Sequence, residues 1–300
     1  MRHLRNLLIS CLSGVLLLPL FCGVSGPLLG LLGGTSQPFL GPISGPAAER
    51  LEAILSTPSA FASQDSPGIV FLERDDVDLD GDGRLDYLTV VCFGKPGAHA
   101  EYHGFVVAVN GMTIEGSGSY LDGKIEIVDI DSTDKFKEIA IPESGPSDDY
   151  GVHVVRYAGR VPAILGHVPG ALYWNNEVVF DGSGVVKGSC RGRILDTWFS
   201  RCEFRLGESG QLVSIPKDLY EMNRRVKLKV DLPIQKSRSD TTRVAVLREG
   251  DSAVILQTDN EKWCLIEGKG GTKGWFEVEN YVTVRGRQAD EVFDGLVHAD

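Results

Sequence analysis

Short apolar or alternating runs, separated by turn residues, fill most of the chain from about residue 66 onward. Ile69–Leu72, Tyr87–Phe93 and Gly104–Asn110 have the length and pattern of strands, and Asn110-Gly111 at the end of the third is a strong hairpin signal. Runs with a helical period are few, and glycine is abundant. We therefore expect a strand-rich middle domain over residues 66–222.

A second series of short strands follows and predicts a separate small barrel over residues 225–285. Turns rich in glycine, aspartate and asparagine divide these strands, among them Gly250-Asp251 and Thr258–Asn260. The last residues, 286–300, are polar and are expected to fray. The five expected strands are Val226–Val230, Arg243–Leu247, Ala253–Gln257, Lys262–Ile266 and Gly274–Val278.

The N-terminal segment has the three parts of an export signal. Arg2 and Arg5 form a positive start, Leu7–Phe21 is an apolar run, and Val24–Gly26 offers small residues for cleavage. An uncleaved N-terminal anchor is the alternative. The segments expected before the middle domain are a signal peptide, 1–26, and a linker, 27–65, with a short amphipathic helix at Ala47–Leu55.

An aspartate motif recurs in the middle domain. Val77–Asp80 is repeated as Val128–Asp131 and more faintly as Phe180–Gly184, at spacings of 51 and 52 residues. Such a period is typical of stacked β units like propeller blades, and three units are fewer than the roughly four blades that close a propeller. The predicted fold class is all-β: an open or partial propeller-like or sandwich domain, then a small barrel. Chance similarity of short acidic turns is the alternative.

The chain is acidic, with a formal net charge of −11. The expected leader contains Arg2 and Arg5 and no acid, so its removal would leave about −13. Such a surface repels nucleic acid and anionic lipid and favours cations and basic partners. We expect no nucleic-acid partner, and membrane attachment only if the leader stays uncleaved.

Four of the six cysteines follow the expected leader. Cys190 and Cys202 are close enough in sequence to face each other across a hairpin, and export favours a disulfide between them. Cys92 and Cys264 lie in strand-like apolar runs and are expected to be core thiols. No Cys-x-x-Cys pair suggests zinc or redox chemistry.

The strongest chemical signal is an acidic loop between two expected strands. Asp78, Asp80, Asp82 and Asp86 occupy loop positions one, three, five and nine, and the backbone carbonyl of Arg84 falls at position seven. Calcium takes six to eight oxygen ligands, which this loop and water could supply. These five residues predict a Ca²⁺ site; a solvated acidic turn is the alternative.

The loop is not an EF-hand, because position twelve is Thr89 where that family needs glutamate. The Asp-x-Asp-x-Asp-Gly-x-x-Asp spacing between strands resembles the calcium loops of FG-GAP (VCBS-type) repeats. The resemblance is specific for the nine loop residues and loose over Ile69 to about Tyr220. It implies a β-hairpin stabilised by calcium.

The second copy of the motif is a degenerate form. It keeps Asp129, Asp131 and Asp134, lacks the glycine, and slips by one position. Lys135 and Lys137 are candidates to replace the charge of the cation. We expect a turn here rather than a metal site.

The C-terminal region resembles a bacterial SH3 (SH3b) domain from Lys227 to Val284. The matching residues are Leu247–Asp251, Trp263 and Gly274–Val278. Domains of this kind often bind cell-wall peptides or glycans through an aromatic groove, and the alternative is that the aromatic residues fill a small core. The candidates for such a groove are Trp263, Trp275, Phe276 and Tyr281.

No motif for nucleophilic, phosphate or dinucleotide chemistry is present, and the close pair His99 and His103 lies among glycines, where a zinc-binding helix is not expected. We therefore expect an exported, non-catalytic envelope protein on the extracellular face that binds cell wall or an envelope partner. The alternatives are an accessory or inhibitor protein of a wall enzyme, and a polysaccharide or peptide hydrolase. The hydrolase site would be assembled from Asp129, Asp134, Glu138, Asp148 and His153.

Overall fold

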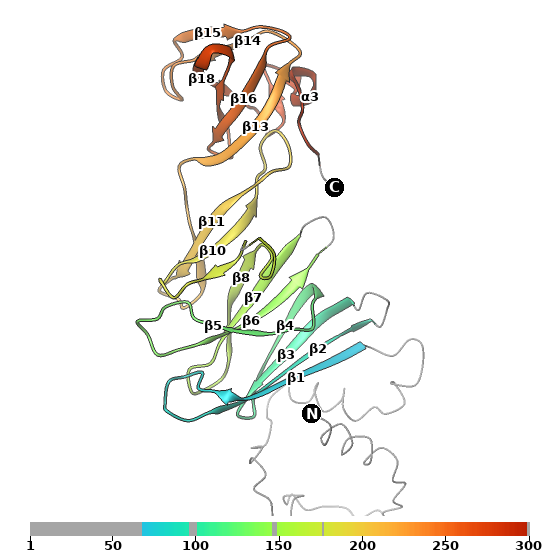
Figure 1. Cartoon of the computed structure of the whole chain (residues 1–300), viewed down its shortest axis with the longest axis vertical. Helices are drawn as coiled ribbons and strands as arrows, with labels where there is room; N and C mark the ends of the chain where they lie inside the picture. Colours follow the sequence, from blue (N-terminus) through green and yellow to red (C-terminus); the bar gives the residue numbers. More distant parts are fainter. Residues whose placement is uncertain (1–67, 96–100, 146–148, 176, 299–300) are drawn as a thin grey trace, which may run out of the picture.

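The computed structural model describes residues 68–95, 101–145, 149–175 and 177–298, and these form an all-β protein, as predicted (Figure 1). The expected leader, linker and helix at 47–55 lie outside the described residues. No helix in the described part of the chain has the length and apolar character needed to cross a membrane.

Twelve strands form three consecutive four-stranded antiparallel units. In each unit an aspartate-containing loop joins the first strand to the second, so the repeated motif marks a repeated structure. Unit 1 comprises β1 (Gly68–Val77), β2 (Asp86–Lys95), β3 (Glu101–Val109) and β4 (Met112–Leu121); unit 2 comprises β5 (Glu126–Val128), β6 (Glu138–Ser144), β7 (Tyr150–Arg156) and β8 (Ala163–Pro169); unit 3 comprises β9 (Val179–Phe180), β10 (Val186–Arg191), β11 (Phe199–Leu206) and β12 (Leu212–Ile215).

The predicted hairpin between β3 and β4 is present. Asn110 and Gly111 both have positive φ, 49° and 82°, the backbone conformation of a tight two-residue turn. Asn110 also ties this turn to the acidic loop, because its side chain accepts a hydrogen bond from the Tyr87 amide and donates one to Asp86.

Unit 2 lies between the other two units. Ile139 and Ile141 on β6 pack with the core of unit 1, whereas the alternate residue Ala140 packs with residues of unit 3. A single pairing of Leu121 with Glu143 joins units 1 and 2 into one eight-stranded sheet, and unit 3 forms its own four-stranded sheet. The described strands leave this arrangement open, since β1 and β12 do not pair.

The C-terminal barrel is larger than the sequence predicted. Its sheet begins at Tyr220 and ends at Asp294. The expected polar tail contributes Val292 and Phe293 to the core, both 1% exposed, because α3 and the strand after it return to β13, where Phe293 pairs with Leu228. The elements are β13 (Tyr220–Leu228), β14 (Leu232–Gln235), β15 (Arg243–Leu247), β16 (Ser252–Thr258), β17 (Trp263–Glu267), η3 (Lys269–Gly271), β18 (Lys273–Glu277), β19 (Thr283–Val284), β20 (Arg287–Gln288), α3 (Ala289–Val292) and β21 (Phe293–Asp294).

The β10–β11 hairpin joins unit 3 to the barrel, and Figure 1 shows it lying between them. Ile194, Leu195 and Trp198 in its loop are buried in the same cluster as the barrel core. The Leu195 amide donates to the Tyr281 carbonyl over 2.7 Å. The hairpin loop of unit 3 therefore forms part of the barrel core, which the expected boundary near residue 225 does not anticipate.

Candidate metal centres

The acidic loop of unit 1 curls around the carboxylate of Asp78. That carboxylate accepts hydrogen bonds from the amides of Gly81 (2.7 Å), Asp82 (3.2 Å) and Gly83 (2.9 Å). Both glycines have positive φ, and a Cβ on Gly81 would lie 2.6 Å from the carbonyl oxygen of Lys135. Glycine is therefore required at position 81, where the loops of units 1 and 2 touch.

Three of the four predicted aspartates converge. One carboxylate oxygen from each of Asp78, Asp80 and Asp86 lies within 4.8 Å of the others, and Asp80 and Asp86 are buried. Asp86 is held by hydrogen bonds from the Leu79 amide (2.7 Å) and the Asn110 side chain (2.6 Å). Asp82 is not in this group.

Asp82 and Arg84 instead interact with each other. The Asp82 carboxylate accepts a hydrogen bond from the Arg84 amide over 2.8 Å, which makes a local turn. The structure thus brings three of the predicted ligands together, and the roles of Asp82 and Arg84 as ligands stay predictions.

No cationic side chain among the described residues pairs with Asp78, Asp80 or Asp86. Burial raises the pKa of the neighbouring Tyr157 hydroxyl, and the charges of Asp86 and Asp80 raise that pKa further. Three carboxylates at this separation repel one another unless a cation lies between them.

The loop of unit 2 shares one hydrogen bond with that of unit 1, and cationic side chains lie beside its carboxylates. The Ile130 amide donates to Glu138 over 2.9 Å, as the Leu79 amide does to Asp86 in unit 1. The charge is balanced by Lys137, 2.6 Å from Asp129, and by Arg156, which binds Glu138 and also lies 3.1 Å from Asp134.

The expectation for unit 2 is thus correct for Lys137 and wrong for Lys135. Lys135 lies over the ring of Phe136, 5.3 Å from its centroid, and among the described residues it forms no ion pair with the aspartates of the loop. Burial raises the pKa of Glu138 more than the Ile130 amide and Arg156 lower it.

The loop of unit 3 is also closed by a lysine. Lys187 lies 2.7 Å from Asp181, and its hydrogen bond, with that of Ser183, lowers the pKa of Asp181 to about 2. The three loops lie next to one another: the Lys137 amide donates to the Leu79 carbonyl, and the Ser132 amide donates to the Gly182 carbonyl. A lysine therefore pairs with an aspartate of the loop in units 2 and 3, and no such lysine is found for unit 1 in the described residues.

Among the described residues, those expected to assemble a hydrolase site divide between two places. Asp129, Asp134 and Glu138 are occupied by Lys137 and Arg156, so they are ion-pair partners in the unit 2 loop. Asp148 lies outside the described residues, as does His99. His153 belongs to a different cluster on β7.

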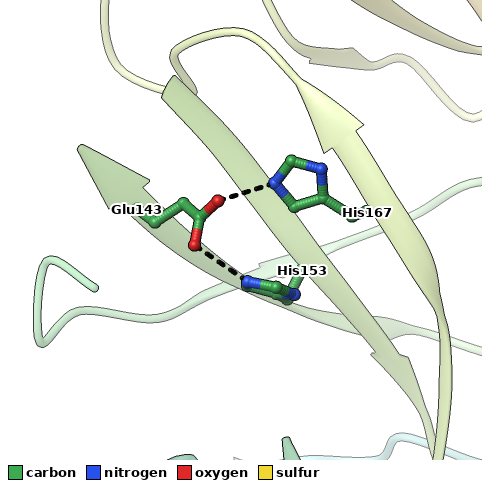
Figure 2. A group of neighbouring side chains, drawn as sticks. All are labelled: Glu143, His153 and His167. Carbon is green, nitrogen blue, oxygen red and sulfur yellow. Dashed lines mark hydrogen bonds and ion pairs between the residues drawn. The ribbon is translucent and has the colours of Figure 1, made fainter. Parts of the chain in front are cut away.

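That cluster, Glu143 with His153 and His167, was missed by the sequence analysis. Glu143 accepts from His153 Nε2 at 3.0 Å and His167 Nε2 at 2.9 Å, one oxygen each (Figure 2). Burial alone would raise the pKa of Glu143, but hydrogen bonds from the two histidines and the Ser119 amide outweigh it and hold the pKa at about 2. The sequence offered one indication of this cluster. A glutamate and two histidines lie within 25 positions, each in a short segment with the pattern of a strand.

The four aromatic residues expected to line a groove do not all face the surface. Phe276 is 4% exposed in the barrel core, so it does not line a surface. Trp263 and Trp275 are half-buried on the opposite face of β17 and β18, with Lys262 and Arg238 over their rings. Tyr281 is exposed in the turn that contacts the β10–β11 hairpin.

Comparison of the chain with protein-family models, curated proteins and solved structures finds no match. The likeness to FG-GAP repeats and to bacterial SH3 domains therefore stays a prediction from the motifs.

Proposed function

We propose that this chain is an exported, non-catalytic, calcium-binding protein of the cell envelope, in which stacked β units support a terminal barrel that binds a cell-wall peptide or glycan or an envelope protein. The observation that carries the proposal is the unit 1 loop, where Asp78, Asp80 and Asp86 converge without a cationic partner among the described residues.

A comparison of the three loops supports calcium binding by the loop of unit 1. Lys137 and Lys187 neutralise aspartates in the loops of units 2 and 3. By analogy, we expect a positive charge beside the aspartates of the unit 1 loop. A bound calcium ion would be the counterpart in unit 1, because clustered carboxylate oxygens are the ligands it prefers. Binding would stabilise the junction of β1 and β2, since metal-binding energy becomes folding energy.

Other features support the proposed location and the proposed partner. The leader-like segment 1–26 and the Cys190–Cys202 disulfide both fit an oxidising compartment. The outward tryptophans Trp263 and Trp275, each with a cation over its ring, offer the barrel a stacking surface for a peptide or sugar.

The test is binding of the full chain, without its first 26 residues, to purified cell walls with and without calcium. We expect the protein to sediment with the walls and to release no wall fragments. Trp275→Ala should reduce sedimentation while the melting curve stays cooperative, with the exposed Val244→Ala on β15 as the matched control. Release of fragments by the wild type, or binding that Trp275→Ala leaves unchanged, would contradict the proposal.

A further inference from the structure

Strand register brings three metal-binding side chains to one face of unit 2. His153 on β7 pairs with His167 on β8 and with Ile141 on β6, and Glu143 is two residues beyond Ile141. Since successive residues of a strand alternate between faces, Glu143, His153 and His167 project from the same side. This is the side packed on unit 1, where Phe105 lies 5.3 Å from the His153 ring.

The three ligand atoms already converge. His153 Nε2, His167 Nε2 and a carboxylate oxygen of Glu143 all lie within 4.8 Å of one another. A tetrahedral zinc ion with bonds of about 2.1 Å holds its ligand atoms about 3.4 Å apart. Small side-chain rotations would therefore suffice to place an ion between the two nitrogens and one oxygen.

Two glycines keep the space around these atoms open. A Cβ on Gly118 would lie 2.7 Å from Glu143 Oε2 and 2.8 Å from His153 Nε2. A Cβ on Gly151, which pairs with Glu143, would lie 2.0 Å from His167 Nε2. Neither glycine has positive φ, so side-chain space rather than backbone conformation accounts for glycine at these positions.

We propose that Glu143, His153 and His167 form a binding site for a divalent transition-metal ion of the zinc class. Two imidazoles and one carboxylate suit zinc, copper, nickel or iron, whereas the all-oxygen loop of unit 1 suits calcium. The Ser119 amide, 2.8 Å from Glu143 Oε2, orients the carboxylate from the neighbouring unit.

The site has one side open to solvent. The Glu143 and His153 side chains are 11% and 13% exposed, but His167 is 40% exposed. Three protein ligands leave a fourth position for water or for an oxygen atom of a small ligand, as in zinc sites that are not purely structural. The competing arrangement is a hydrogen-bonded cluster in which both histidines simply donate to Glu143.

Zinc titration of the full mature chain, prepared without a histidine tag and stripped with chelator, separates the two arrangements. We expect one zinc ion per chain by calorimetry, and cobalt in its place should give the intense visible bands of a tetrahedral site. Glu143→Gln and His167→Gln should each weaken binding at least about tenfold, since loss of an outer-shell partner alone costs about 10–100-fold.

His103→Gln is the matched control, because His103 is an exposed histidine on β3 outside the cluster. Asp80→Ala should keep the zinc response, and His167→Gln should keep the calcium response, so that failure of one metal proposal is distinguishable from failure of the other. His167 is exposed, so its variant should fold even if His153→Gln does not. Absence of stoichiometric zinc binding in the wild type, or affinity unchanged in His167→Gln, would overturn the proposal.

Discussion

Asp86 and Glu138 occupy the same place in units 1 and 2, yet they meet different partners. Each accepts a hydrogen bond from the amide of the buried residue after the first aspartate, Leu79 or Ile130. Arg156 then binds Glu138, whereas no cationic side chain in the described ranges binds Asp86. The cationic side chains near each loop thus distinguish an ion-pair network in unit 2 from a candidate calcium site in unit 1.

At this scale we predict that Asp80→Ala abolishes the calcium response. With calcium at tenfold its dissociation constant, binding stabilises the native state by about 1.4 kcal/mol, or about 3–6 °C in Tm for a chain of this size. Melting curves with calcium and with chelator measure this shift. Magnesium should produce less, because it holds its water and needs a tighter octahedron.

The equivalent change in unit 2, Asp131→Ala, is the control. Asp131 accepts hydrogen bonds from Thr133 rather than facing other carboxylates, so its loss should leave the calcium response intact. If neither calcium nor chelator changes the melting temperature of the wild type, the unit 1 loop is an acidic turn and not a calcium site.

Among the elements, the β10–β11 hairpin connects unit 3 to the barrel. Its strands pair from Val186–Phe204 to Arg191–Phe199, and Cys190 and Cys202 form the disulfide that the sequence suggested. The loop beyond this disulfide inserts Ile194 and Trp198 into the barrel core. The covalent link therefore restrains the segment that connects the two parts of the molecule.

Replacing both cysteines, Cys190→Ser with Cys202→Ser, should destabilise the protein by about 3 kcal/mol, the loop-closure entropy for the 12-residue separation. Denaturant unfolding of the variant against the oxidised wild type measures the difference. The buried thiols Cys92 and Cys264, whose pKa values burial raises to about 12, should stay unmodified by alkylating reagents in both folded proteins. Finding Cys190 and Cys202 as free thiols in unreduced wild-type peptides would contradict this prediction.

Over the whole molecule, buried contacts from the β10–β11 hairpin loop join unit 3 to the barrel. Asp196 in the hairpin loop has a fully buried side chain 2.8 Å from Arg224 at the start of the barrel, and it accepts from the Val297 amide. Burial raises the pKa of Asp196 more than the Val297 amide and Arg224 lower it. Breaking such a buried pair is costly, because it leaves one charge without its partner.

We predict that Trp198→Ala destabilises the barrel, although Trp198 belongs to unit 3. The indole is 4% exposed in the barrel core, and removal of a buried Trp side chain costs about 3–5 kcal/mol. Thermal and denaturant unfolding measure the loss. The adjacent Phe199, which is 41% exposed, provides the control, and Phe199→Ala should have little effect.

A barrel fragment that starts at residue 220 provides the second measurement. It lacks the hairpin and exposes the apolar surface that Ile194, Leu195 and Trp198 cover, so it should be much less stable than the barrel in the full chain. A fragment that melts cooperatively at the temperature of the full chain would show that the shared core is dispensable.

Features that depend on residues close together in sequence were predictable from the sequence. Strand alternation, the Asn110-Gly111 turn, the Cys190–Cys202 pairing and the curl of the Asp78 loop each involve neighbours within one hairpin or loop. Their local chemistry leaves few alternatives, because turn geometry and side-chain period act over a few residues.

The tertiary structure decided everything that depends on strand register and packing. The sequence contains Glu143, His153 and His167 but not the register that places them on one face, and the bulge between Val154 and Val155 alters that register. The pairing of Arg156 with Glu138 and the insertion of Trp198 into the barrel likewise join distant segments. A slip of one residue turns every side chain of a strand to the other face, so only the folded sheet brings these groups together.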